Sequence, residues 1–196
     1  MSYIELIVVL GIFSVLSSVV LFNYGAFQAK VDIKSLASDI ALKFVEAQKA
    51  SLSGKLPPLA QQSQISPTWK PAYGVYLDPS FDNKSFVYFT DLNNPTQNSF
   101  YDASACPGTE ECLERITITK NNTISGLTVF YQGGTSASLS DLTVTFKRPN
   151  SAAIIKSTTV FTLPISYVQV SIFSPKASTN NTARIKIYPS GRIQVN

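Results

Sequence analysis

Hydrophobic residues are concentrated at the start of the chain, where they form one continuous run. No charged residue occurs between Leu6 and Ala29, and residues 6–22 read LIVVLGIFSVLSSVVLF. A helix needs about 20 consecutive apolar residues to cross the hydrocarbon core of a bilayer. The pattern therefore predicts a helix over residues 1–25 that is apolar on all sides and must be covered by lipid or by other subunits.

After Gly25 the pattern changes from uniformly apolar to amphipathic. Apolar residues recur at spacings of three and four, which places them on one face of a continuing helix. Gly54, followed closely by two prolines, ends this helix. A helix over residues 2–53 would be on the order of 75–80 Å long, more than one small domain can cover. The predicted buried face comprises Ile33, Leu36, Ala37, Ile40, Ala41, Phe44 and Val45.

Residues 55–196 have the pattern of a β-rich head. Loop-forming residues occupy 56–71, and short β-branched or alternating runs follow, separated by Gly, Pro, Asn and Ser. We expect an α+β fold in which the amphipathic half of the helix, residues 26–54, packs on an antiparallel β-sheet. Pro189, Ser190 and Gly191 predict the turn of a closing hairpin. The predicted strands are 73–77, 85–90, 115–119, 127–131, 142–146, 166–173, 184–188 and 192–195.

The composition excludes the chemistry that depends on histidine. The 196 residues include no histidine, so a Ser-His-Asp triad and His-ligated zinc are both absent. Glu110, Glu111 and Glu114 offer paired carboxylates, but without a base or a glycine-rich cradle we interpret them as a solvated turn. We therefore predict that the chain is not an enzyme and has no catalytic residues. The net charge of +4 comes from scattered Lys and Arg and predicts no specific nucleic-acid partner.

The two cysteines, Cys106 and Cys112, flank a Pro-Gly turn. In an oxidising compartment we expect them to form a disulfide, which contributes roughly 2 kcal/mol for so short a loop. The alternative is a pair of free thiols.

Oxygen-bearing side chains are frequent between residues 91 and 102. Asp91, Asn93 and Asp102 fall at the first, third and twelfth positions of a calcium-binding loop. The glycine of the sixth position and the terminal glutamate of such a loop are missing. Two interpretations stay open: a calcium site, and a surface loop whose side chains cap its own turns. No other cofactor is predicted.

Glu5 is unusual because it lies at the edge of the apolar run. A carboxylate in hydrocarbon costs several kcal/mol unless it is paired or neutralised. The first lysine of the chain is Lys30, more than seven helical turns away. The available partner is therefore an α-amino group, of the same or a neighbouring subunit. The other interpretation is a glutamate at the membrane interface that reaches the lipid head groups.

The sequence Met1-Ser-Tyr-Ile-Glu5-Leu-Ile-Val-Val-Leu-Gly11-Ile resembles the mature N-terminus of type IV pilins and type II secretion pseudopilins. The resemblance covers about 30 residues and includes the position of the glutamate. In that family prepilin peptidase removes a basic leader and the new N-terminus is methylated, which implies that Met1 is the processed, methylated residue. The family more often has Phe at this position, and many members have Pro where this chain has Phe22. More loosely, the predicted head resembles that of pseudopilin H and the minor pilins.

The resemblance implies a structural subunit of a bacterial type IV pilus or similar extracellular filament. Its partners would be identical subunits in a helical homopolymer, the inner membrane before assembly, and the assembly machinery with prepilin peptidase. Such fibres serve cell adhesion or twitching motility. Alternatives are a minor pilin or pseudopilin of a secretion or DNA-uptake fibre and, more distantly, a membrane-tethered enzyme or adhesin. The assembly residues would be Met1 and Glu5, and the filament-core residues Leu6, Ile7, Val8, Val9, Leu10, Ile12, Phe13 and Leu16.

Overall fold

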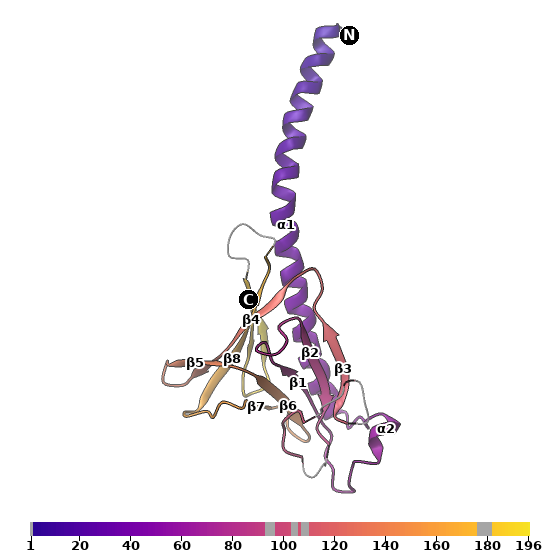
Figure 1. Ribbon diagram of the computed structural model, residues 1–196, viewed down its shortest axis with the longest axis vertical. Coiled ribbons are helices and arrows are strands. Elements are labelled where there is room, and N and C mark those ends of the chain that lie inside the picture. Colours follow the sequence, from indigo (N-terminus) through magenta and orange to yellow (C-terminus); the bar gives the residue numbers. More distant parts are fainter. Residues whose placement is uncertain (1, 93–96, 103–105, 107–109, 176–181) are drawn as a thin grey trace.

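In a computed structural model of the chain, one helix projects from a head of two β-sheets (Figure 1). The structure describes residues 2–92, 97–102, 106, 110–175 and 182–196, without the side chains of residues 20–23 and 26. The elements are α1 Tyr3–Leu52, α2 Leu59–Gln62, β1 Ala72–Leu77, β2 Ser85–Thr90, β3 Cys112–Thr117, β4 Thr123–Tyr131, β5 Ser136–Leu139, β6 Leu142–Lys147, β7 Ala153–Lys156, β8 Ile165–Phe173, β9 Thr182–Ile187 and β10 Ile193–Val195.

Helix α1 contains 50 residues and ends where the sequence predicts. Gly54 has a φ of +70°, and the N–H groups of Gly54 and Lys55 donate to the carbonyls of Ser51 and Ala50, both at 3.1 Å. These bonds satisfy carbonyl groups that the helix leaves free at its C-terminus. The chain then turns through α2 into β1.

The head contains two five-stranded sheets, where the sequence predicted one sheet region. Their strand orders are β3-β2-β1-β6-β7 and β10-β9-β8-β4-β5, and every strand pair is antiparallel. The chain enters the second sheet at β4, returns to the first for β6 and β7, and completes the second with β8 to β10. The predicted α+β class with antiparallel sheets is confirmed, and the prediction of a single sheet is wrong.

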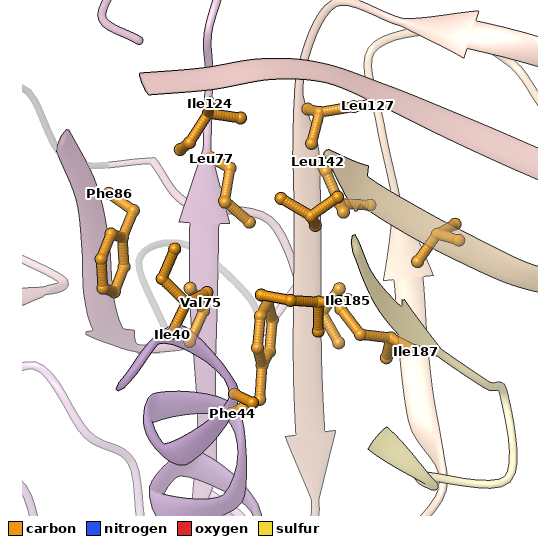
Figure 2. Close-up of a cluster of buried hydrophobic side chains, with 14 of the residues drawn as sticks. Ile40, Phe44, Val75, Leu77, Phe86, Ile124, Leu127, Leu142, Ile185 and Ile187 are labelled. Carbon is orange, nitrogen blue, oxygen red and sulfur yellow. The ribbon is translucent and has the colours of Figure 1, made fainter. Parts of the chain in front are cut away.

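The amphipathic face of α1 packs against both sheets. Ile33, Ala37, Ile40 and Phe44 are each at most 3% exposed and belong to one core with residues from the two sheets. Figure 2 shows Ile40 and Phe44 pointing toward Val75 and Leu77 of β1 and Ile185 and Ile187 of β9. Of the predicted face, Val45 alone is not part of this core, because it lines the outer side of the helix.

The predicted closing hairpin joins β9 to β10. Gly191 has a φ of +86°, and its N–H donates to the carbonyl of Tyr188 at 2.8 Å. A Cβ at this position would lie 2.0 Å from the carbonyl oxygen of Ser151, so only glycine fits the turn. The hairpin is also fixed to α1, because Gln48 Nε2 donates to the carbonyls of Ser151 and Gly191 at 2.8 and 3.2 Å.

Candidate functional site: an assembly surface on α1

The first turns of α1 present an uncovered apolar surface. From Tyr3 to Val19 every side chain is exposed except Ser17, which is partly exposed. The exposed fractions of the large apolar residues in this stretch lie between 49% and 81%. Monomeric soluble proteins rarely expose a contiguous apolar surface of this extent. All eight predicted filament-core residues belong to it: Leu6, Ile7, Val8, Val9, Leu10, Ile12, Phe13 and Leu16.

Within the described residues, no helix has an apolar stretch that is long enough to span a membrane.

Glu5 lies at the start of the helix and is exposed. Ser2 has an extended backbone and precedes the first turn, and its N–H donates to Glu5 Oε2 at 3.2 Å. A carboxylate at this place also compensates the positive end of the helix dipole. Met1 lies outside the described residues, so the predicted pairing of Glu5 with an N-terminal amine stays a prediction.

The apolar surface continues along the outer side of α1 beside the head. Tyr24, Phe27, Val31 and Leu42 are 62%, 65%, 44% and 62% exposed. Their numbers differ by three, four and eleven, so they follow one side of the helix. A groove of about 760 Å³ lies at the end of this stripe and is lined by Leu42, Val45 and Ala50 together with charged residues. The sequence analysis did not find this outer stripe, because serines interrupt it.

Two long-range ion pairs help to fix α1 to the head. Lys43 Nζ lies 2.9 Å from Glu114 Oε2, and Lys120 Nζ lies 2.7 Å from Asp32 Oδ1. Helix α1 is thus anchored through its second half, and its apolar first half points away from the head (Figure 1).

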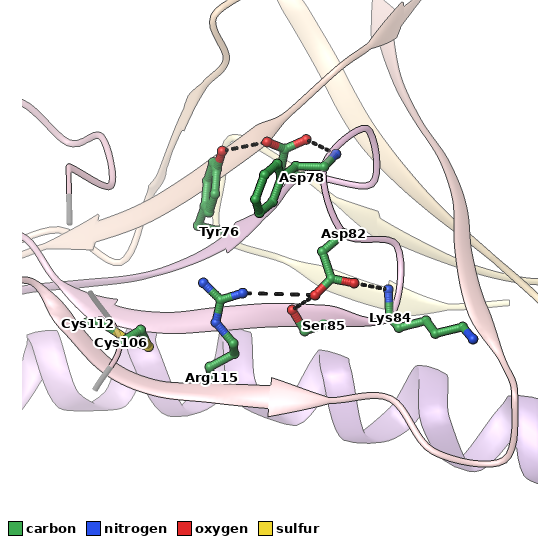
Figure 3. A network of polar contacts seen from close by, with 9 residues as sticks. Tyr76, Asp78, Asp82, Lys84, Ser85, Cys106, Cys112 and Arg115 are labelled. Atoms are coloured by element: carbon green, nitrogen blue, oxygen red, sulfur yellow. Dashed lines mark hydrogen bonds and ion pairs between the residues drawn. A yellow bond between two sulfur atoms is a disulfide. The ribbon is translucent and has the colours of Figure 1, made fainter. Parts of the chain in front are cut away.

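The structure confirms the predicted disulfide between Cys106 and Cys112, whose Cα atoms are 5.2 Å apart. Cys112 begins β3 and is buried, so the bridge ties the preceding loop to an edge strand of the first sheet (Figure 3).

Asp91 and Asp102, two of the three predicted calcium ligands, each accept a hydrogen bond from elsewhere in the same loop. Asp91 is fully buried, and its Oδ2 accepts a hydrogen bond from the backbone of Ser99 at 3.0 Å. Among the residues that the structure describes, no group of three Cys, Asp or Glu could hold a metal ion. Asn93 lies outside them, so the calcium interpretation stays untested.

The prediction that Glu111 lies in a solvated turn is wrong. Glu111 is 6% exposed, and its carboxylate accepts the N–H groups of Leu92 and Asp102 at 3.0 and 2.9 Å. Burial raises the pKa of Glu111 to about 7 and that of Asp91 to about 6, since it disfavours the charged form. The two carboxylates therefore organise the loops around β2 and β3.

A polar cluster at the turn between β1 and β2 also has a structural explanation (Figure 3). Ser85 Oγ and the N–H of Lys84 both donate to Asp82, and these bonds lower the pKa of its carboxyl group. Arg115 Nη1 lies 3.9 Å from Asp82 Oδ2. A carboxylate with a lowered pKa is a weak base, so the arrangement suits a turn cap better than an activated serine.

No family model and no curated protein sequence matches this chain. Among solved structures, it is similar to the minor pseudopilin EpsH from the type II secretion system of Vibrio cholerae. The sequences are 10% identical and the TM-score is 0.41, over 85% of this chain and 94% of that chain.

Proposed function

We propose that this chain is a structural subunit of a type IV pilus-like filament, built by packing the first halves of α1 helices together. The observation that supports it is the exposed apolar surface of residues 3–19, which the head of the same chain does not cover. Burying apolar surface contributes about 25 cal/mol per Å², so residues of this size favour association strongly. A rigid helix fixed to its head would repeat the same contact from one subunit to the next.

The contact would be heterologous, because the apolar half of one subunit meets a different side of its neighbour. A heterologous contact whose rotation does not close generates an open helical filament instead of a ring. The heads would then cover the outside of the fibre. The proposal includes storage in the inner membrane before assembly, where lipid covers the same apolar surface. It also includes processing by prepilin peptidase, N-terminal methylation and an extracellular location of the fibre.

Detergent removal from the purified full-length chain tests the proposal. We expect fibres that sediment at high speed, because packed helices replace the detergent as apolar surroundings. Phe13 is 67% exposed, so Phe13→Lys should stay in the supernatant, whereas the matched change Lys34→Ala on the head-bearing half should still sediment. A wild-type chain that stays monodisperse without detergent would contradict the proposal.

Glu5 has a separate role in this proposal: it would pair with the N-terminal amine of Met1 in a neighbouring subunit. In apolar surroundings the two charges cost much less together than apart, so the pair would set the axial register of an incoming subunit. Glu5→Ala should leave the subunit folded but lower the ratio of sheared fibre to membrane-held subunit, and Glu5→Gln should behave alike. Lys34→Ala, an exposed change on the head-bearing half of the helix, is the control. Wild-type fibre yield from Glu5→Ala would mean that Glu5 only anchors the subunit at an interface.

A further inference from the structure

The second sheet has an outer face that points away from the core. In β4, β8 and β9 alternate residues such as Val129, Val168 and Ile185 are buried against α1 and the first sheet. The residues between them point outward and are partly or fully exposed. Because the strands are in register, these outward side chains form rows that cross the sheet.

One row is aromatic and ends in a cation. Phe130 and Tyr167 are directly opposite on β4 and β8, and their rings stack with centroids 4.6 Å apart. The ring of Tyr188 follows at 5.5 Å from that of Tyr167, and the Arg192 guanidinium carbon lies 4.0 Å from the centroid of Tyr188. Four side chains thus form a continuous ridge across the sheet.

The adjacent row consists of amides, a hydroxyl and a cation. Thr128 lies opposite Gln169, Gln169 opposite Lys186, and Lys186 opposite Gln194. Lys186 Nζ also lies 5.0 Å from the ring centroid of Tyr167, which joins the two rows. Arg184 adds a further exposed cation one row beyond, opposite Ser171.

The strands of this face carry Lys and Arg but no acidic side chain. The strands β4, β8, β9 and β10 contain no Asp or Glu. Indeed residues 142–196 contain seven Lys and Arg and no acidic residue, although the whole chain has 12 acids. A surface of one sign attracts ligands of the opposite sign. The natural occupant of the face is therefore an anion.

We propose that the outer face of the second sheet binds an extended polysaccharide that carries carboxylates, such as a polyuronate. The hydroxyl groups of the sugars would bond the amides of Gln169 and Gln194, and single carboxylates would pair with Lys186, Arg184 and Arg192. The three cations are separated by uncharged side chains, which suits a polymer with spaced single charges.

Single-stranded nucleic acid fits this face less well. Its binding platforms depend on open aromatic faces on which the bases stack. Here Phe130 covers one face of Tyr167, Lys186 lies over the same ring, and Arg192 lies over Tyr188. The rings thus contact one another and the side chains of Lys186 and Arg192, and they hold these two cations in place on the face.

Fluorescence anisotropy with a labelled decamer of galacturonate and the full-length chain in detergent tests this inference. Wild type should bind the decamer, and Lys186→Gln should weaken binding about tenfold because a charge-assisted bond is lost. Gln194→Ala, which changes no charge, should weaken binding about threefold through a lost neutral hydrogen bond. Lys70→Gln, an equal loss of charge on an exposed loop outside the face, is the matched control and should change affinity little.

Three outcomes would overturn the inference. The first is that the galacturonate decamer does not bind, and the second is that Lys70→Gln weakens binding as much as Lys186→Gln. The third is that oligo-dT of equal length binds more tightly than the decamer. If Lys186→Gln lowers the melting temperature, Gln194→Ala replaces it as the test. Gln194 is exposed on the edge strand β10, so we expect its substitution to leave the fold intact.

Discussion

The two halves of α1 share one continuous helix but have opposite surroundings. In the second half, Ile33, Ile40 and Phe44 are buried by the two sheets, and charged residues share the outer side with the exposed Val31 and Leu42. In the first half, Phe13 and Leu16 are 67% and 62% exposed, and no charge follows Glu5 before Lys30. The head thus acts as the apolar surroundings of one half only, and the other half requires a cover from outside the chain.

The largest expected effect separates the halves directly. Phe44→Ala removes a fully buried ring and should lower the free energy of unfolding of the head by about 3–5 kcal/mol. Phe13→Ala, the same substitution on an exposed ring, should leave the unfolding of the head unchanged. Chemical denaturation in detergent, followed by the fluorescence of Trp69, measures both. Equal destabilisation by the two changes would mean that the halves are not energetically distinct.

The disulfide should support the head without affecting the exposed half of α1. Reduction of Cys106–Cys112 should lower the free energy of unfolding by roughly 2 kcal/mol, the chain-entropy value for so short a loop. Sedimentation of fibres after detergent removal should not change at temperatures where the reduced head stays folded. Thermal melting with and without reductant gives the first quantity. A loss of fibres from a folded, reduced chain would place the disulfide loop in the assembly contact.

The head should also become less stable as the pH rises. Burial raises the pKa of Glu111 to about 7 and that of Asp91 to about 6, whereas carboxylates in an unfolded chain titrate near 4. The folded head therefore binds more protons than the unfolded chain between about pH 4 and 7, so the stabilisation from these groups is lost across that window. Melting at pH 5 and pH 8 should show the decrease.

Glu111→Gln should flatten this pH profile, because an amide resembles the protonated carboxyl group. Glu114→Gln is the matched control, since Glu114 is an exposed carboxylate three residues further along the chain, in β3. A profile as steep in Glu111→Gln as in wild type would show that other groups cause the pH dependence.

Calcium should have the smallest effect. Both Glu111 oxygens accept backbone N–H groups and Asp91 Oδ2 accepts that of Ser99, so within these two carboxylates Asp91 Oδ1 is the oxygen left for a cation that takes about six to eight ligands. The melting temperature of the head should be the same in millimolar calcium and in chelator, because a ligand of the folded state would raise it. A clear rise with calcium would instead support the loop site at Asp91, Asn93 and Asp102.

Sequence patterns predicted the helix and the strands that are encoded by their own residues. The apolar run and the three–four spacing predicted α1 through Leu52, and a short run of aromatic and β-branched residues predicted β2 at Ser85–Thr90. The sequence analysis missed β5 and β7, which read Ser-Ala-Ser-Leu and Ala-Ile-Ile-Lys. These short strands form because β4 and β6 pair with them, and strand formation depends on such neighbours more than on intrinsic propensity.

The remaining features depend on long-range contacts that a local pattern does not contain. The division into two sheets arises from pairings between distant segments, such as β4 with β8 and β1 with β6. Glu111 is buried because the N–H groups of Leu92 and Asp102 reach its carboxylate from another part of the chain. The candidate assembly surface, by contrast, was predictable in its first half because an uninterrupted apolar run is itself the signal.

Electron cryomicroscopy of the assembled fibre tests the central claim most directly. We predict that residues 6–19 lie at the fibre axis, packed on the same segment of neighbouring subunits, with the two-sheet heads on the outside. A fibre held together by its heads, with residues 6–19 exposed at the surface, would contradict it.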